Sequence, residues 1–527
     1  MNKLNLLISL ILAFTSSTLV AQDNTSALMP MVNSIQQLKQ EPFCLNGQEA
    51  SFYINDPSLD FVSQELQKVF IEYMNISCTK SVKKQAQIHL TINKSLGKEE
   101  YFLNINNKLL EITGGSKAGV FYGLKTLEQI MMGDVCNTKN KKIAAIEIKD
   151  KPRYSFRGLM VDPARHFLPI QDLKFFIDQM ARYKYNKLQI HLTDDQGWRM
   201  EIKSIPELTS LGEYYTQEEL TDLINYADDR NIEIIPELDV PGHVVALLAT
   251  HPELGCTNTQ NQPKEIGKTE NMMLCAANDN VYTLYDTIIS EVANLFPSSK
   301  IHMGGDEARI PKNWLQCEKC TALMKELGYT NGEQLMIPFF KKIKESVEKY
   351  NKELMLWCEL DSEYAPANDY LFPYDKDITL ISWRWGLTPT CLELTSEHEN
   401  PIIMAPGEHA YLDYPQLKGD LPEFNNWGMP VTTLKQCYKF DPGYGYPQDK
   451  QNHVLGVLGT LWGEAMKDIN RVTYMAFPRA FAIAEAGWTE MPHRNWNSFV
   501  ERMYPNITNL MKKGVSVRVP FEIVERK

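Results

Sequence analysis

Short apolar runs alternate with longer amphipathic stretches along the chain after residue 153. Eight runs have the length of a buried strand, at residues 158–162, 187–193, 232–239, 300–305, 353–357, 378–383, 401–406 and 454–460. Stretches with apolar residues at helical spacing lie between them, at residues 171–183, 217–230, 281–295, 333–349 and 471–486. Repeated strand–helix units of this number predict an α/β fold, a (β/α)₈ TIM barrel.

The competing architecture is an open, doubly wound sheet, which usually carries a glycine-rich phosphate turn after its first strand. The first strand here runs into DPARHF, and neither GxGxxG nor GxxxxGK[ST] follows it. The pattern therefore favours the barrel, and we expect no cofactor.

The pattern of apolar and polar residues is different before the barrel. Residues 22–150 alternate short β-rich runs (87–93, 102–107 and 109–115) with a helical segment at 118–131. This pattern predicts a small α+β domain. The segment Lys151-Pro152-Arg153 indicates the boundary, so that residues 151–527 are expected to form the barrel domain.

The first 21 residues have the layout of a secretory signal peptide. Lys3 precedes an apolar stretch from Leu4 to Phe14, and small and polar residues follow up to Ala21. The stretch is too short for a good membrane span, and no later run is long enough either. We therefore expect an exported protein, periplasmic or secreted, or lysosomal in a eukaryote, with no membrane span in the mature chain.

Composition and charge limit the kinds of molecule that the protein is expected to bind. Hydrophobic residues make up 43% of the 527 residues, and 66 acidic residues outnumber 54 basic ones, which gives a net charge of −12. This charge has the wrong sign for a protein that binds phosphate backbones, so nucleic acid is not an expected partner.

Ten cysteines in a chain of this length do not make a disulfide scaffold, although export permits a few bridges. Cys256 and Cys275 bracket a polar loop and are the best candidate pair. Cys317 and Cys320 form a CxxC motif, but no second CxxC or HxxxH completes a zinc set. A local disulfide or simple packing is the favoured interpretation of that motif.

The expected strand ends are rich in acids and tryptophans. A barrel builds its active site at the carboxyl ends of its strands. Any one of these residues alone is more often a helix cap or a core residue, but their recurrence indicates function. Sugars present apolar faces to rings and hydroxyls to acids, so the combination is typical of carbohydrate chemistry. Asp306-Glu307 is the strongest candidate pair, and without an HExxH motif we expect no catalytic metal.

Several motifs, in this order, resemble glycoside hydrolase family 20, the β-N-acetylhexosaminidases. They are RGLMVDPARHF, HLTDDQGWRMEI, ELDVPGH, HMGGDE, YLDYP and LWGE, and GVFYGLKTLEQI resembles the end of the small domain that precedes the family's barrel. The resemblance covers roughly residues 30–500. It implies an exo-acting, retaining enzyme that removes terminal GlcNAc or GalNAc from glycoconjugates or chitooligosaccharides.

The resemblance also implies substrate-assisted catalysis, in which the substrate's acetamido oxygen attacks the anomeric carbon and no enzyme carboxylate is the nucleophile. Glu307 then matches the general acid and base, and Asp306 the residue that holds the acetamido group and stabilises the oxazolinium ion. Tyr411 matches the donor to the acetamido oxygen. His243 and Asp194 match the family's His–Asp pair beside the acid.

Further motif positions imply the sugar pocket. Trp357, Trp383 and Trp462 match its aromatic wall, with Trp385 as the reserve for the second position. Arg157 is expected to bind O3 and O4, and Asp413 and Glu464 to reach the O4 and O6 side. Cys358 departs from the family pattern after the fifth strand, so the neighbouring Glu359 takes no role by analogy.

Two other hypotheses stay open. One is a retaining glycosidase with a carboxylate nucleophile, which requires Asp239 or Glu464 about 5 Å from Glu307. The other is a catalytically inactive glycan-binding protein on the same fold, against which the intact acid pair argues. The sequence indicates neither a GlcNAc nor a GalNAc preference and no oligomeric state.

Overall fold

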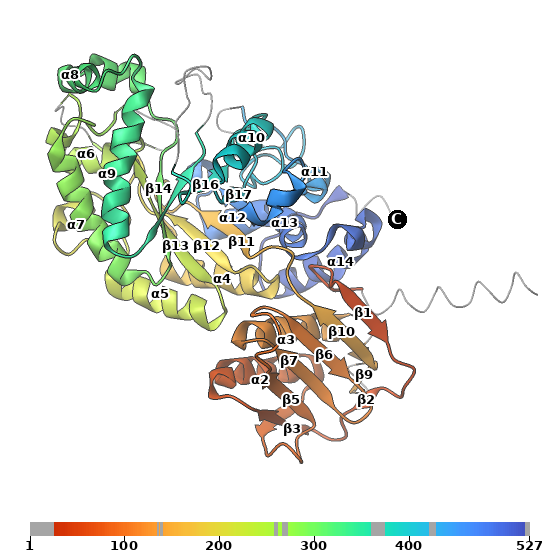
Figure 1. The fold of residues 1–527 in the computed structure, drawn as a ribbon. Helices are drawn as coiled ribbons and strands as arrows, with labels where there is room; N and C mark the ends of the chain where they lie inside the picture. Colours follow the sequence, from red (N-terminus) through yellow and green to blue (C-terminus); the bar gives the residue numbers. More distant parts are fainter. Residues whose placement is uncertain are drawn as a thin grey trace, which may run out of the picture. The chain divides into compact units, whose positions relative to one another are not determined.

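The computed structural model describes residues 26–133, 136–137, 141–257, 262–265, 272–359, 375–420 and 428–521, so the expected signal peptide lies outside the described residues. The chain divides into two compact units, which are described separately below. The first comprises Met1–Arg153 with Trp488–Val515 and Val519–Lys527, and the second comprises Tyr154–Gly487 with Ser516–Arg518 (Figure 1). Among the described residues, no helix is both long and apolar enough to cross a membrane.

The second unit is a closed barrel of eight parallel strands, as predicted. Its strands are β11 (Phe156–Val161), β12 (Lys187–His191), β13 (Glu233–Val240), β14 (Lys300–Gly304), β15 (Glu353–Trp357), β16 (Thr379–Ser382), β17 (Ile402–Met404) and β18 (Val454–Leu461). The barrel closes where β11 pairs with β18, from Phe156 opposite Gly456 to Val161 opposite Leu461. Every expected strand is present, because continuous apolar runs suit strands buried on both faces.

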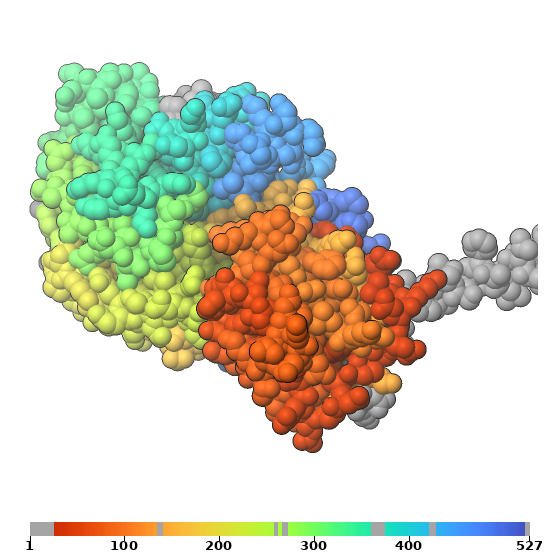
Figure 2. Space-filling view, turned by 60° about the horizontal axis from the view of Figure 1, so that its bottom comes forward, coloured from red at the N-terminus to blue at the C-terminus, as the bar shows by residue number. Residues whose placement is uncertain are grey.

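Helices follow the strands and surround the barrel (Figure 1). The α-helices of this unit are α4 (Ile170–Arg182), α5 (Gln217–Asp229), α6 (Val245–Thr250), α7 (Asp279–Leu295), α8 (Glu318–Glu326), α9 (Met336–Lys349), α10 (Thr388–His398), α11 (Leu434–Lys439), α12 (Ile469–Ala476) and α13 (Arg479–Trp488). In the space-filling view, yellow-to-green residues cover one side of the barrel unit (Figure 2).

Four of the five expected barrel helices agree with α4, α5, α7 and α9. The start of α5 is fixed by a capping box, in which the Thr216 and Glu219 side chains bond each other's backbone N–H. The expected helix at 471–486 is instead two helices, α12 and α13. They are separated at Phe477-Pro478, because proline has no N–H to donate within a helix.

Side chains fill the interior of the barrel. Phe156, Met160, Ile235, Met355 and Leu458 belong to one buried cluster, against which half-buried tryptophans pack. Each such side chain contributes about 1.5–3 kcal/mol of burial free energy. The packed interior gives the strand ends a rigid base.

The first unit is an α+β structure, as expected. Its seven-stranded sheet has the order β1 (Ser34–Gln37), β10 (Ile146–Asp150), β6 (Tyr101–Ile105), β7 (Leu110–Gly114), β5 (Ile88–Ile92), β3 (Glu49–Ile54) and β4 (Ser77–Lys80). A smaller sheet joins β2 (Phe43–Cys44), β9 (Lys142–Ile143) and β8 (Cys136–Asn137). The unit also holds α2 (Asp60–Met74), α3 (Lys117–Met132) and α14 (Trp496–Lys512).

Helix α14 belongs to the first unit, although residues 151–527 were expected to form the barrel domain. Arg502 Nη1 donates to the Leu28 carbonyl at 2.6 Å, and Asn506 Nδ2 donates to the Ala27 carbonyl at 2.9 Å. Trp488 Nε1 donates to Asp150 at 2.9 Å. The end of the chain therefore packs with the first unit, through contacts between residues hundreds of positions apart that no local pattern announces.

The predicted Cys256–Cys275 disulfide is wrong in the structure, where both cysteines are free. A disulfide needs two sulfurs about 2.05 Å apart in a specific geometry. Here Cys256 and Cys275 instead share their surroundings with Cys317 and Cys320, and the four sulfurs lie within 4.8 Å of one another. The CxxC motif, interpreted above as a local disulfide or simple packing, is therefore half of a larger group.

Candidate active site

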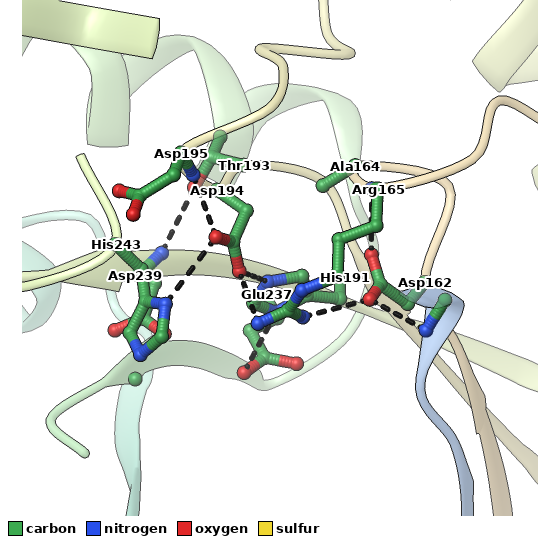
Figure 3. Close-up of polar contacts among 12 residues, drawn as sticks. Asp162, Ala164, Arg165, His191, Thr193, Asp194, Asp195, Glu237, Asp239 and His243 are labelled. Atoms are coloured by element: carbon green, nitrogen blue, oxygen red, sulfur yellow. Dashed lines mark hydrogen bonds and ion pairs between the residues drawn. The ribbon is translucent and has the colours of Figure 1, made fainter. Parts of the chain in front are cut away.

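The expected acid pair meets two predicted partners at the carboxyl ends of β12, β13 and β14. His243 follows β13, and its Nε2 lies 3.9 Å from an Asp306 oxygen and 3.7 Å from a Glu307 oxygen. Its Nδ1 lies 3.3 Å from Asp194, which follows β12 (Figure 3). Four residues that the resemblance implied to act together are thus within contact distance.

The two glycines before the acid pair are required by the backbone and by a neighbouring side chain. Gly304 and Gly305 have φ values of +63° and +99°, which favour glycine. A Cβ at Gly304 would lie 1.7 Å from Asp239 Oδ1. Glu307 itself has a φ of 49°, an uncommon value for a residue with a side chain. This backbone aims adjacent side chains in different directions, and the Glu307 side chain stays 34% exposed while Asp306 is buried.

Asp194 lies at the centre of a buried network of charges (Figure 3). His191 Nε2 contacts it at 2.8 Å and Arg165 Nη2 at 3.0 Å, and the backbone N–H of Asp195 donates to it at 2.6 Å. Burial alone would raise the pKa of Asp194, but Arg165, His243 and His191 lower it well below its usual value. Asp194 is therefore a fixed negative charge.

His243 carries the complementary charge. Burial disfavours its imidazolium form, but the carboxylates of Asp194, Asp239 and Asp306 outweigh that effect and raise the pKa of His243 well above its usual value. A protonated His243 donates from both ring nitrogens. It therefore connects the Asp194 network to the acid pair.

The arginine at the site is Arg165, and the prediction for Arg157 is wrong. Arg157 is the second residue of β11, at the amino end of the strand, and its buried guanidinium donates to the carbonyls of Lys184 at 3.0 Å and Tyr154 at 2.8 Å. Arg165 lies in the loop after β11. It contacts Asp162 at 2.7 Å and stands over the Trp462 ring at 5.1 Å. The sequence could have indicated this, because Arg165 in DPARHF lies beyond the end of the first strand.

Asp239, at the end of β13, is a second site residue to which the family resemblance assigned no role. Its Oδ1 accepts from the Gly305 N–H at 3.3 Å, and it lies within 4.8 Å of His243 and Asp306 atoms. Burial and the charge of Asp306 raise the pKa of Asp239 well above its usual value. Burial also raises the pKa of Asp306, against the effect of His243. Two facing buried acids share a proton most easily, and the larger rise in pKa favours Asp239 as its holder.

Glu359 is buried next to the acid pair. The Arg384 guanidinium donates to its Oε1 from Nη2 at 2.6 Å and from Nε at 3.1 Å, and the Glu307 N–H donates to its Oε2 at 3.5 Å. Burial raises the pKa of Glu359 to about 8 in spite of Arg384, with Asp306 and Glu307 adding to the rise. The sequence did not predict this contact, because Cys358 departs from the family pattern and Glu359 was therefore given no role.

Aromatic rings adjoin these polar groups. Trp357, at the end of β15, is buried, and its Nε1 donates to Glu237 at 2.7 Å. Its ring centroid lies 6.4 Å from that of Trp383 and 5.6 Å from that of Trp462. Tyr411 stacks on Trp383 with an interplanar angle of 16° and a centroid distance of 6.4 Å. The structure thus brings together all four aromatic residues that the resemblance implied.

The choice between the two tryptophans of ISWRWG also has a structural answer. Trp383 packs against the barrel cluster, whereas Trp385 is 44% exposed and its ring lies 6.3 Å from that of Tyr414. Trp383 is therefore the tryptophan that belongs to the aromatic group.

Several buried polar atoms at this end of the barrel have no hydrogen-bond partner among the described residues: Asp306 Oδ1, Trp383 Nε1, the Tyr411 hydroxyl, Asp413 Oδ1 and Glu464 Oε2. Buried polar groups in folded proteins are normally paired. A cluster of unpaired acceptors and donors next to tryptophan rings is complementary to a ligand rich in hydroxyl and amide groups.

The same region contains two groups of three potential metal ligands, each of which includes Asp239. His191, in the first group, has one ring nitrogen 2.8 Å from Asp194 and the other 3.2 Å from Glu237. His243, in the second, is likewise engaged at both nitrogens. Because these imidazoles already face carboxylates, the geometry favours a network of ion pairs over a metal centre.

A (β/α)₈ barrel with a carboxylate pair among tryptophans at the carboxyl ends of its strands defines a carbohydrate-cleaving hydrolase. Comparison with known proteins agrees. Residues 154–491 match the catalytic domain of glycosyl hydrolase family 20, and residues 25–151 match domain 2 of that family. The chain belongs to glycoside hydrolase family 20.

Individual relatives support the same conclusion. The chain is 35% identical to a β-hexosaminidase of Akkermansia muciniphila, over 80% of this chain and 85% of the relative. It is 32% identical to a β-hexosaminidase of Porphyromonas gingivalis, over 91% of this chain and 64% of that relative. These matches confirm the predicted enzyme class, a glycoside hydrolase of the β-N-acetylhexosaminidase type.

Solved structures share the fold over almost the whole chain. A β-N-acetylhexosaminidase crystal structure superposes with a TM-score of 0.78 at 30% identity, covering 94% of this chain and 97% of the other. An exo-β-N-acetylglucosaminidase of Vibrio harveyi in complex with N-acetylglucosamine gives a TM-score of 0.80 at 28% identity, covering 94% and 79%. The predicted fold class is confirmed.

Proposed function

We propose that this β-N-acetylhexosaminidase removes terminal GlcNAc or GalNAc by substrate-assisted catalysis, with Glu307 as the general acid and base and Asp306 as the residue that holds the acetamido group. The observation that carries the proposal is that the two carboxyl groups, Asp306 and Glu307, have different surroundings. Glu307 is one-third exposed, whereas Asp306 is buried with one oxygen unpaired. Adjacent carboxyls with different surroundings suit different tasks.

In the first step, Glu307 gives a proton to the glycosidic oxygen as the bond from that oxygen to the anomeric carbon breaks. The acetamido oxygen of the substrate forms the replacing bond to the same carbon, which yields an oxazolinium ion and the free leaving group. His243, charged and 3.7 Å from Glu307, orients the acid.

Asp306 and Tyr411 act on the acetamido group itself. The unpaired Asp306 Oδ1 accepts the acetamido N–H and stabilises the positive charge that develops there. The unpaired Tyr411 hydroxyl donates to the acetamido oxygen and positions it. In the second step, Glu307 takes a proton from water while that water opens the ring at the anomeric carbon. The product retains the β-configuration.

The remaining contacts hold the sugar. Trp357, Trp383 and Trp462 provide the wall of the pocket, and the unpaired oxygens of Asp413 and Glu464 bind hydroxyls on the O4 and O6 side. Arg165 takes the role expected of Arg157, binding O3 and O4, because it is the arginine at the carboxyl end of the first strand.

A carboxylate nucleophile fits the site less well. Asp239 is held neutral by burial and by Asp306, and one of its oxygens accepts from Gly305. Glu464 lies 3.8 Å from Arg165 and serves the far side of the pocket. A neutral acid is a poor nucleophile, and the acetamido group supplies a better-placed one. The intact acid pair also argues against an inactive binding protein.

The test compares hydrolysis of the p-nitrophenyl β-glycosides of GlcNAc, GalNAc and glucose by the wild type and by Glu307→Gln, with N,N′-diacetylchitobiose as a substrate with a poorer leaving group. We expect cleavage of the N-acetyl substrates only. Loss of a general acid costs about 10²- to 10⁴-fold in rate. The loss should be larger for diacetylchitobiose, because p-nitrophenolate needs less protonation.

Glu345→Gln, at an exposed position of α9, is the matched control and should retain full activity. Cleavage of the plain glucoside at a comparable rate would contradict assistance by the acetamido group. Equal losses on both leaving groups would contradict the acid role of Glu307. The GlcNAc to GalNAc ratio of the wild type measures the preference directly.

We also propose that the protein is exported, with residues 1–21 as its signal peptide. The layout of Lys3, the apolar stretch Leu4–Phe14 and the small residues up to Ala21 supports this. Amino-terminal sequencing of the protein recovered outside the cytoplasm should begin shortly after Ala21. A chain recovered there with Met1 intact would contradict the proposal.

A further inference from the structure

Four cysteines converge from the two loops that follow β13 and β14 in the barrel unit. Cys256 and Cys275 lie in the connection between β13 and α7, and Cys317 and Cys320 lie at the start of α8, after β14. The sulfur of Cys320 is 4.0 Å from that of Cys256 and 3.6 Å from that of Cys275, and Cys275 and Cys317 are 3.9 Å apart. All four sulfurs lie within 4.8 Å of one another.

These separations are those of a metal site with tetrahedral geometry. A zinc–thiolate bond is about 2.3 Å long, so four sulfurs around one zinc ion lie about 3.8 Å from each other. A disulfide requires about 2.05 Å between its two sulfurs, well below the three distances above. Four thiolates with no other ligand are also the donor set of closed, structural zinc sites, and soft sulfur ligands select zinc over hard cations.

The backbone around the cysteines is fixed by contacts of its own. The Cys275 N–H donates to the Leu254 carbonyl at 2.8 Å, and Gly255 pairs with Leu274 in an isolated bridge. Trp314 Nε1, from the other loop, donates to the Leu274 carbonyl at 2.8 Å. Both loops are therefore held in register, which places the thiols together without a bond between them.

Simple packing of unliganded thiols is a poor explanation of this arrangement. Cys275, Cys317 and Cys320 are all buried, and Cys256 is half-buried. Four small polarisable groups could pack as hydrophobes, but nothing in packing requires three sulfur–sulfur separations near the tetrahedral value. Metal binding does require it.

We propose that Cys256, Cys275, Cys317 and Cys320 bind one structural Zn²⁺ ion. Binding converts four thiols to four thiolates, forms four zinc–sulfur bonds and releases four protons, with no oxidant consumed. The ion joins the loop after β13 to the loop after β14. These loops begin with His243 and with the Asp306-Glu307 pair, so the site supports the segments from which the catalytic groups extend.

The decisive experiment measures metal content and thiols in the full-length protein purified without chelators. Elemental analysis of the wild type should find one zinc per chain. Thiol titration of the unreduced, denatured protein with a chelator should find all ten cysteines. Two disulfides within the group would leave six titratable thiols and no zinc, and would overturn the proposal. Ten thiols without stoichiometric metal would overturn it as well.

Variants and cobalt substitution localise the ion. The double variant Cys317→Ser/Cys320→Ser should lose the zinc, whereas Cys44→Ser, at a half-buried cysteine of the first unit, should keep it. If the double variant does not fold, wild-type protein loaded with Co²⁺ decides the matter. It should show the sulfur-to-cobalt charge-transfer and intense d–d absorption of a tetrahedral tetrathiolate site, and a spectrum of octahedral cobalt would contradict the proposal.

Discussion

Two groups of buried carboxylates stand side by side in the barrel and behave in opposite ways. Asp194, with Asp162 next to it, faces Arg165 and two histidines, and its pKa is lowered well below its usual value. Asp239 and Asp306 face each other, and the pKa of each is raised. Burial is nearly complete in both groups, so burial does not explain the difference.

The number of cations at each group does explain it. Burial raises the pKa of each of these acids, and only enough positive charge reverses the direction. Asp194 has Arg165, His191 and His243 around it, whereas Asp239 faces the two histidines without an arginine and Asp306 faces His243. The first group is therefore a fixed set of charges, and the second is a place where protons are held next to Glu307, the proposed catalytic acid.

Removing the cation of the first group should have the largest effect. In Arg165→Met, Asp162 and Asp194 lose their contacts at 2.7 and 3.0 Å, and breaking a buried pair in this way costs about 3–5 kcal/mol of stability. We also expect a raised KM, because Arg165 is the proposed ligand of O3 and O4. Urea unfolding and steady-state kinetics measure the two effects.

Arg157→Met is the matched control, since Arg157 is also buried but lies at the amino end of its strand. It should destabilise the barrel without raising the KM of the folded enzyme. A higher KM in both variants would show that the kinetic effect of Arg165 comes from general loss of structure.

The next largest effect is expected for Asp194→Asn. The amide keeps the shape but not the charge, and hydrogen bonds to charged groups contribute about 1.5–3 kcal/mol. The pKa of His243 should also fall, because Asp194 is the main cause of its rise. The alkaline limb of the pH dependence of kcat/KM should then move to lower pH.

The pH dependence of stability gives an independent check. The raised pKa of His243 contributes stability that is complete below its unfolded value near 6.5 and is lost as the pH rises through its folded value. The lowered pKa of Asp194 contributes stability that is present above its unfolded value near 3.8 and is lost as the pH falls through its folded value. An Asp194→Asn stability curve parallel to that of the wild type would contradict the pairing.

The sequence predicted the barrel well because its signal is local. Each strand is a continuous apolar run, and HMGGDE places the acid pair directly after β14. The sequence did not distinguish Arg157 from Arg165, because both lie in one motif and only the end of β11 separates them. An apolar run shows that a strand exists more clearly than it shows where the strand stops.

Features made by distant residues were beyond the sequence patterns. The four cysteines come from separate loops, and Cys256 and Cys275 have no CxxC spacing between them. The partner of Glu359 is Arg384, which arrives from the next strand. Long-range contacts of this kind depend on tertiary packing, so only resemblance to a family or a structure reveals them.

Asp239→Asn should be milder than Asp194→Asn, although both residues are buried at the ends of neighbouring strands. Asp239 is already neutral, and an asparagine can still accept from the Gly305 N–H and donate to Asp306. We expect a loss of at most about 1 kcal/mol, the value of an ordinary hydrogen bond. Urea unfolding at neutral pH measures it. A loss as large as that of Asp194→Asn would show that Asp239 is ionised and would remove the contrast between the two groups.

The last effect is expected for Glu359→Gln, and it is a change in the pH dependence of stability rather than in stability at one pH. The pKa of Glu359 is about 8, above its usual value of 4.5, so the folded state binds the extra proton between these values. Stability must therefore fall as the pH rises from about 4.5 to 8 through this group. The glutamine variant cannot titrate there, and its free energy of unfolding should fall less over that interval. Urea unfolding of both proteins at several pH values within it measures the slope. Equal slopes would mean that Arg384 keeps Glu359 ionised, and Glu359 would then belong with the fixed charges around Asp194.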